Sequence, residues 1–140
     1  GVAMPENAVK YAEDIGGYRL VRAIMELGEF KHIHLVAHSS GCWLADVAAK
    51  EIAKKIKPDI HITFLDAYIP NGWDEKKLGD IKVKKGVTLW CEHYYDKDLT
   101  LKRTQMILPN AVNVDITKAD PWFKEHKFPI RWYTATITGR

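Results

Sequence analysis

A short β-prone segment that runs directly into a helix constrains the fold of this chain more than any other feature. Residues 33–37 have the length and side chains of a buried strand, and a turn at 38–41 leads into a helical pattern over 42–57. Pro58 ends that pattern, and a second apolar strand is expected at residues 60–65. Strands joined by a helix pair in parallel, so the segment predicts a βαβ unit and an α/β fold.

The remaining segments extend this unit into a larger sheet. Residues 5–27 have apolar side chains at helical spacing, with two consecutive glycines that mark either a break or a close packing contact. Further strands are expected at residues 87–90 and 111–116, whereas the aromatic-rich segment 129–137 is compatible with a strand or a helix. We therefore predict an α/β protein with a mostly parallel sheet flanked by helices.

Length and charge limit the classes of function. The 140 residues are enough for one domain with a single core, and 21 basic residues lie among 18 acidic ones, for a net charge of +3. The basic cluster of Lys82, Lys84 and Lys85 has no interleaved aromatic residues, so no nucleic-acid partner is expected. No apolar run is long enough for a transmembrane segment. Cys42 and Cys91 fit a reduced protein and a single disulfide equally well, so they assign no cellular compartment.

The turn Ala37-His38-Ser39-Ser40-Gly41 is the strongest functional motif in the chain. A strand, a sharp turn between small residues and a helix are typical of a nucleophile elbow, which presents a serine at the carboxyl edge of a parallel sheet. Ser39 is then the nucleophile, and the backbone N–H of Ser40 faces the position where an oxyanion would form. The structural alternative is that either serine only caps the helix.

Residues 8–70 resemble the pancreatic-type lipase family, over a little under half of the chain. The resemblance rests on an alanine-led helix with glycines in its middle, a His-Ser elbow at the end of a strand, and a later strand that ends in Leu-Asp. The matching segments are Ala8, Gly16-Gly17, His34-Leu35-Val36-Ala37-His38-Ser39 and Ile62-Thr63-Phe64-Leu65-Asp66-Ala67 through Pro70. The resemblance implies an α/β-hydrolase fold, a serine esterase or lipase activity without a cofactor, and a small-molecule or lipid ester as substrate.

A serine nucleophile needs a general base, and the base needs an acid that orients it. In α/β-hydrolases the chain order is serine, acid, histidine. Asp66 ends the strand that follows the elbow helix, where the resemblance places the acid, and it is our preferred candidate. Asp96 lies just beyond the next strand and is the alternative acid, with Glu92 third.

Two histidines follow in the order that the base requires. His126 begins the pattern His126-x-x-Pro129-x-x-Trp132-Tyr133, which resembles the terminal histidine loop of some α/β-hydrolases. His93 could act only if the loop after Trp90 reached back to the elbow. We therefore expect His126 to be the base, with a surface histidine as the structural alternative.

Several histidines raise the question of a metal site. His32, His34 and His38 share strand parity, but no carboxylate follows them at the spacing of a metallo-hydrolase motif, and His61 resembles a residue at a strand entry. We expect no metal and keep a zinc hydrolase as a further possibility that metal analysis would test.

The sequence does not show every part of the α/β-hydrolase fold that the resemblance implies. Before residue 33 the sequence contains one helical region and no strand, so the N-terminal strands of the full fold and a second oxyanion donor are not found. We expect a truncated or minimal α/β-hydrolase domain over residues 1–140, whose exposed strand edge is covered by a second copy or a partner chain. The leading function is carboxylic ester hydrolysis through Ser39, Asp66 and His126, and the alternative is a catalytically silent fragment or binding module.

Overall fold

A parallel four-stranded sheet organises the chain. The structure, a computed structural model, describes residues 5–97, 101–120 and 126–140. Within these residues the strand order is β1-β2-β3-β4, and every neighbouring pair is parallel. The strands are β1 (His32–His38), β2 (Asp59–Leu65), β3 (Leu89–Tyr95) and β4 (Val112–Asp115). The expected α/β class with a parallel sheet is confirmed.

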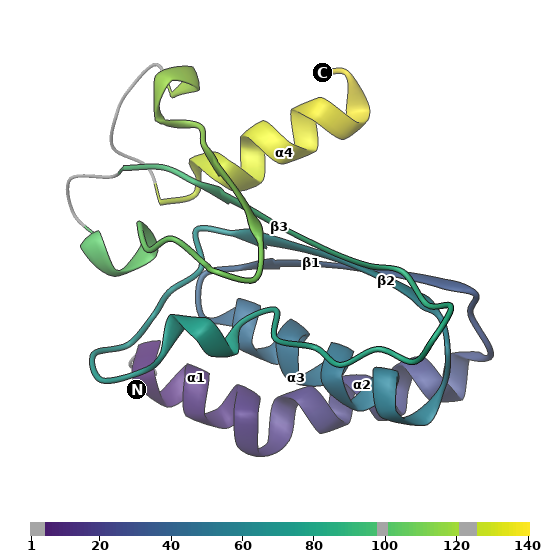
Figure 1. Cartoon of the computed structure of the whole chain (residues 1–140). Helices are drawn as coiled ribbons and strands as arrows, with labels where there is room; N and C mark the ends of the chain where they lie inside the picture. The colour runs from purple at the N-terminus through teal and green to yellow at the C-terminus, as the bar shows by residue number, and fades with distance from the viewer. Residues whose placement is uncertain (1–4, 98–100, 121–125) are drawn as a thin grey trace.

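Helices lie on both faces of this sheet (Figure 1). α1, α2 and α3 lie together below it in that view, and α4 lies on the opposite face. The helices are α1 (Pro5–Tyr11), the π-helical turn η1 (Ala12–Gly16), α2 (Gly17–Leu27), α3 (Gly41–Lys55) and α4 (Phe128–Thr138). Short 3₁₀ turns occur at η2 (Glu75–Lys77), η3 (Lys102–Thr104) and η4 (Thr117–Ala119). No helix among the described residues combines the length and apolar character that crossing a membrane requires.

The glycine pair inside the first helical region is a packing contact and not a break. A Cβ atom at Gly17 would lie 2.4 Å from Cγ1 of Val47, which is closer than van der Waals contact allows. At Gly16 it would lie 3.0 Å from Cδ1 of Leu44. The small residues therefore let this helix approach α3 closely, and the π turn at η1 keeps the chain helical through the pair.

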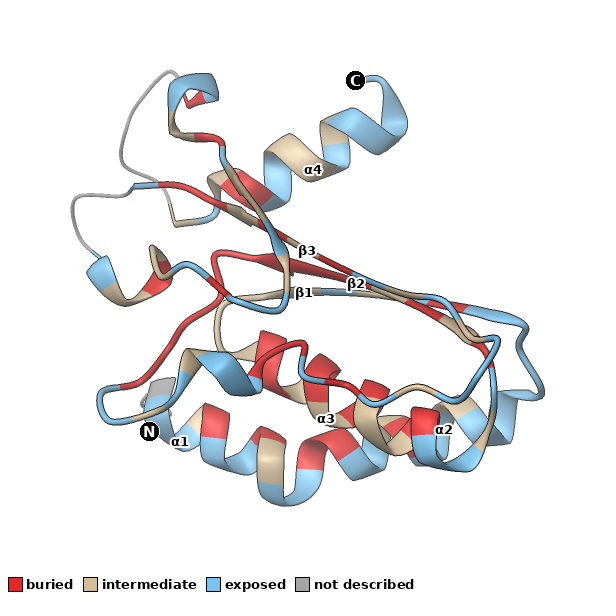
Figure 2. Ribbon diagram, viewed as in Figure 1, coloured by how far each residue is buried: buried red, intermediate tan, exposed pale blue. Residues whose placement is uncertain are grey.

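The core lies between the sheet and α3. Ile62 and Phe64 on β2, together with Ile52 on α3, are completely buried, and Figure 2 shows buried residues of α3 on the side that faces the sheet. Trp43 is also completely buried, and its Nε1–H donates to the carbonyl of Tyr68 at 2.8 Å. This indole anchors the segment after β2 to α3, since a buried N–H requires an acceptor.

Three elements differ from the sequence-based expectation. α3 ends at Lys55 and not at residue 57, because the residue before Pro58 is biased away from helical geometry. β3 runs from Leu89 to Tyr95, since parallel pairing with β2 extends it beyond its apolar start. The undecided tail is the helix α4, with proline in its first turn and Gly139 in the left-handed conformation at its end. The cysteines form no disulfide, because both are buried as free thiols.

β1 is an edge strand of this sheet. It pairs with β2 on one side and has no neighbouring strand on the other among the described residues. Val36, on the face opposite α3, has 47% of its surface exposed. An apolar edge strand with unpaired backbone groups can template association with another chain.

Candidate functional site

Ser39 occupies the sharp turn between β1 and α3. Its φ angle is 57°, in the left-handed region that non-glycine residues rarely adopt. Backbone hydrogen bonds hold it there: its N–H donates to Leu65 at 2.9 Å, and its carbonyl accepts from Cys42 at 3.2 Å and from Tyr68 at 3.3 Å. These bonds tie the turn to the end of β2, so Ser39 lies at the carboxyl edge of the sheet.

Asp66 lies at the same edge, directly after β2. Its side chain is completely buried, Oδ1 accepts from the backbone N–H of Asp96 at 2.8 Å, and Oδ2 lies 3.0 Å from Nδ1 of His126. Burial raises the pKa of Asp66, and the hydrogen bond with His126 acts in the opposite direction. The carboxylate is therefore fixed by two partners and directed at a histidine that lies 60 residues further along the chain.

Ser39 and Asp66 share an unusual backbone conformation. They are the only non-glycine residues with a positive φ in the described part of the chain, at 57° for Ser39 and 45° for Asp66. Such strain costs on the order of 1–3 kcal/mol per residue and concentrates at functional sites. The two residues follow neighbouring strands, so this edge of the sheet is a candidate functional site.

His38 is a member of this group that the sequence did not indicate as a site residue. Its Nε2–H donates to the carbonyl of His126 at 2.8 Å, and the two rings have centroids 4.3 Å apart. His38 thus fixes the backbone of the segment that carries His126. One feature of the sequence could have indicated His38 as a site residue. It is the last residue of the strand that leads into Ser39, so it lies at the same edge of the sheet.

The Ser39 hydroxyl is not part of the described hydrogen-bond network. Within the described residues, His126 is held through Nδ1 by Asp66 and through its carbonyl by His38, and neither bond involves that hydroxyl. Hydrogen bonds between a nucleophile and its base are often long in ligand-free enzymes and tighten when substrate binds. The geometry therefore brings Asp66 and His126 into contact and places Ser39 on the same edge.

The alternative candidates occupy other positions. Asp96 supplies a backbone donor to Asp66, and burial together with the neighbouring Asp120 raises the pKa of its carboxyl to about 6. His93 is completely buried and hydrogen-bonded to the backbone of Ala67 and to the side chain of Asn113, so it is not available as a base for Ser39.

Glu92 lies away from the Ser39 edge. It is bonded to His61 and Thr63, with α4 on the same side of the sheet, where Tyr133 approaches Thr63. This leaves Asp66 as the one acid of the three that contacts His126 among the described residues.

An apolar pocket of about 440 Å³ opens beside the turn. It lies where the N-terminal end of α3 faces the first helical region. Its lining residues are Asn7, Ala8, Tyr11, Ala12, Ser40, Gly41 and Leu44. Phe64, Ile69 and Trp90 are apolar side chains that do not line it. Phe64 and Ile69 are completely buried in the core, and Trp90 contacts Glu92.

Ser40 is the N-cap residue of α3. Ser40 precedes the first turn of α3, where N–H groups have no acceptor within the helix. Its side chain makes no capping hydrogen bond, so the capping explanation of this serine is not supported. The elbow motif predicts that position 41 needs a small residue. The structure does not require one there for packing, because a Cβ atom at Gly41 would meet nothing within 4 Å.

Two groups of described side chains have the composition of a metal site. His38, Asp66 and His126 form one, and His34, His61 and Glu92 form the other; in each, one ligand atom per residue lies within 4.8 Å of the others. In the first group Nδ1 of His126 and Nε2 of His38 are already engaged in hydrogen bonds. Ring nitrogens are hydrogen-bonded in the second group as well, and what distinguishes the first is that the completely buried carboxylate of Asp66 orients the His126 ring at the Ser39 edge.

Comparisons with models of known families, with curated proteins and with solved structures find no match for this chain.

Proposed function

We propose that the protein is a serine hydrolase that cleaves carboxylic esters, with Ser39, His126 and Asp66 as nucleophile, base and acid. The observation that carries the proposal is the 3.0 Å contact between the buried carboxylate of Asp66 and Nδ1 of His126. A buried carboxylate on Nδ1 fixes the tautomer in which Nε2 can accept a proton, which is the arrangement a serine nucleophile requires. The strained turn at Ser39 adds a second, independent feature of such a site.

The chemistry follows from these roles. Oγ of Ser39 attacks the ester carbonyl while Nε2 of His126 takes its proton, and Asp66 stabilises the imidazolium that forms. The N–H of Ser40 donates to the developing oxyanion. The imidazolium then protonates the leaving alcohol as the carbon–oxygen bond of the ester breaks. Water attacks the acyl-enzyme by the same route, which releases a carboxylic acid and restores Ser39.

The apolar pocket supports an ester with a hydrocarbon acyl group. Ser40 and Gly41 of the turn line it together with Ala8, Tyr11 and Leu44. Burial of each methylene contributes about 0.8 kcal/mol, so a pocket of this lining favours short to medium acyl chains over acetate.

A catalytically silent binding module is the second candidate. It is favoured by one observation: within the described hydrogen bonds of His126, the Ser39 hydroxyl takes no part. Loss of one oxyanion donor in other enzymes lowers the rate about 10²–10³-fold. A site in which the N–H of Ser40 is the single oxyanion donor would therefore hydrolyse esters slowly. Such a module would still bind an apolar ligand beside the turn.

Covalent labelling with a fluorophosphonate separates the two candidates, with p-nitrophenyl butyrate as substrate. We expect the parent protein to be labelled and to show a burst of nitrophenol, and the Ser39→Ala variant to lose both. Ser40→Ala is the matched control, because it keeps its backbone N–H and is expected to retain labelling. Full activity in Ser39→Ala would exclude this nucleophile, and a parent that is never labelled would favour the silent module.

A further inference from the structure

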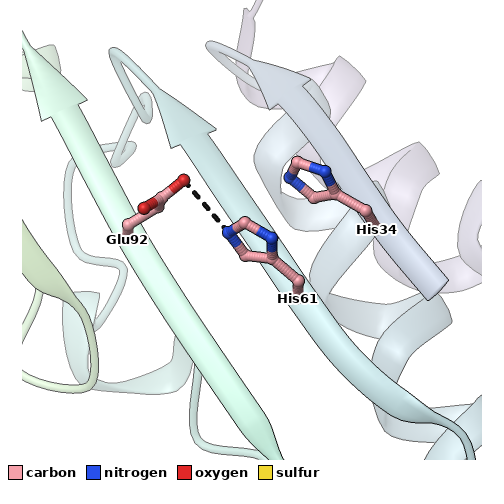
Figure 3. Close-up of side chains that lie close together, drawn as sticks. All are labelled: His34, His61 and Glu92. Atoms are coloured by element: carbon pink, nitrogen blue, oxygen red, sulfur yellow. Dashed lines mark hydrogen bonds and ion pairs between the residues drawn. The ribbon is translucent and has the colours of Figure 1, made fainter. Parts of the chain in front are cut away.

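Three polar side chains gather on the sheet face opposite α3, away from the Ser39 edge. His34, His61 and Glu92 come from β1, β2 and β3 and project from the same face of the sheet (Figure 3). His34 and His61 are partners in the parallel register, and their rings stack with centroids 3.8 Å apart and an interplanar angle of 2°. The ligand atoms of the three residues lie within 4.8 Å of one another.

The hydrogen bonds of this cluster converge on a single region. Nε2 of His61 lies 3.0 Å from Oε1 of Glu92, and the Thr63 hydroxyl donates to the same oxygen at 2.7 Å. Nε2 of His34 lies 2.8 Å from the Thr63 oxygen. Because the one proton of that hydroxyl goes to Glu92, His34 is the donor in this contact. Two imidazole nitrogens and one carboxylate oxygen, linked through the Thr63 hydroxyl, therefore lie within 4.8 Å of one another.

The other carboxylate oxygen of Glu92 is held separately. Oε2 accepts from Nε1 of Trp90 at 3.1 Å and from the hydroxyl of Tyr94 at 3.2 Å. This orients the carboxylate so that Oε1 alone faces the two histidines. Carboxylates that bind metal ions are commonly fixed through hydrogen bonds of this kind, which set the position of the ligating atom.

We propose that His34, His61 and Glu92 form a Zn²⁺ site on this face of the sheet, separate from the hydrolase centre. Two imidazoles and one carboxylate are a ligand set that zinc accepts, with a fourth position left to water. The ion would replace the hydrogen bonds at Oε1 and link the edge strand β1 to β2 and β3. This site does not depend on the proposed ester hydrolysis, since none of its residues contacts Ser39, Asp66 or His126 in the described interactions.

Binding requires a local rearrangement of the two imidazole rings. Zinc ligands lie about 2.0–2.2 Å from the ion, so two ligand atoms of a tetrahedral site are roughly 3.3 Å apart. The ligand atoms of this cluster lie up to 4.8 Å from one another and must therefore move closer together. Both rings must turn about the Cβ–Cγ bond so that their Nε2 atoms converge, with the proton moving to Nδ1. The turn breaks the stacking of the two rings and the hydrogen bond between His34 and Thr63, which the bonds to the ion would replace. His34 is exposed, and the side chain of His61 retains 24% of its accessible surface.

Isothermal titration with ZnCl₂, on protein first treated with a chelator, tests the site. We expect one ion per chain in the parent, and at least about tenfold weaker binding in His34→Ala, His61→Ala and Glu92→Gln, because even loss of a supporting residue costs that much. The cysteines do not compete in the folded protein, since both are buried and burial raises the pKa of Cys91 to about 11.

Two control variants make the result specific. His32→Ala removes an exposed histidine from the same strand and is expected to bind zinc as the parent does. His126→Ala removes a ligand from the other candidate group and is also expected to leave zinc binding unchanged. The proposal is overturned if the parent binds no zinc below about 100 µM, a concentration far above the dissociation constants expected from zinc-site energetics. It is also overturned if His34→Ala and His61→Ala bind like the parent, or if binding disappears only in His126→Ala.

A thermal melt gives a readout that is independent of calorimetry. A ligand that binds only the folded state raises the melting temperature, so zinc is expected to raise it in the parent and not in His34→Ala. His34 is exposed, so its replacement is expected to preserve the fold, which far-UV circular dichroism would verify. The Ser39→Ala variant should bind zinc normally, and failure of ester hydrolysis would therefore leave this result intact.

Discussion

Nδ1 of His126 and Oδ2 of Asp66 are 3.0 Å apart, although 60 positions separate the two residues along the chain. The carboxylate is completely buried and also holds the backbone N–H of Asp96. Removing its charge while keeping its shape therefore tests what the pair does, because the neighbouring contacts can persist.

The Asp66→Asn variant is expected to lower kcat for p-nitrophenyl butyrate by about 10³–10⁴-fold. The amide can donate to Nδ1 and so favour the tautomer in which Nε2 already carries a proton and cannot act as a base. Steady-state kinetics would measure the change. Asp96→Asn is the matched control, since the contact of Asp96 with Asp66 is through its backbone, and its kcat should fall less than about tenfold. Equal losses in the two variants would contradict the assignment.

Stability below neutral pH should depend on His93. Nε2 of this buried ring accepts from the N–H of Ala67 and Nδ1 faces Oδ1 of Asn113, so the fold holds it neutral. Burial lowers its pKa from 6.5 to about 4, whereas in the unfolded chain it protonates near its ordinary value. Between these two pKa values the unfolded state binds more protons than the folded state. The stability that the neutral His93 ring contributes is therefore lost as the pH falls from 6.5 towards 4, by about 3 kcal/mol in total.

Urea unfolding of the parent and of His93→Leu across this pH range would measure the effect. The buried carboxyl of Asp96, with a pKa near 6, contributes an opposite slope in both proteins, so the difference between them isolates His93. We expect the stability difference between parent and variant to shrink as the pH falls. A difference that stays constant from pH 7 to pH 4 would show that the ring is not held neutral.

The close approach of the first helical region to α3 depends on Gly17. Alanine there would place its Cβ 2.4 Å from Cγ1 of Val47, so Gly17→Ala should destabilise the fold by about 1–3 kcal/mol despite its better helix propensity. Gly41→Ala is the control, because its Cβ would meet no atom within 4 Å, and its stability should stay within about 0.5 kcal/mol of the parent. Chemical denaturation measures both, and a neutral Gly17→Ala would refute the contact.

The open edge of β1 should make the protein associate. Val36 lies on this edge strand with 47% of its surface exposed, and among the described residues no strand pairs with the outer side of β1. We expect sedimentation velocity to show concentration-dependent association of the parent at tens of micromolar, and Val36→Lys to shift it towards the monomer, because an edge lysine opposes strand pairing. A folded, active parent that stays monomeric throughout this range would contradict the hypothesis.

Local sequence patterns predicted most of the elements. Apolar side chains of the right length and the stop at Pro58 marked β1, α3 and β2, because buried strands and amphipathic helices carry their periodicity in adjacent residues. The sequence pattern did not distinguish a helix from a strand in the segment that forms α4. Its aromatic side chains suit either structure, and its helix is stabilised by packing of Trp132 and Tyr133 against Tyr94 on β3.

The sequence by itself determined the strand–turn–helix at Ser39, because strand, turn and helix are neighbours in the chain and their chemistry is local. Only the tertiary structure decided that His126 contacts Asp66 and not Asp96, since that choice depends on where a distant segment packs. The register of three parallel strands likewise placed His34, His61 and Glu92 together. Pairing between strands is set by the whole core, so no spacing within one segment could have indicated that cluster.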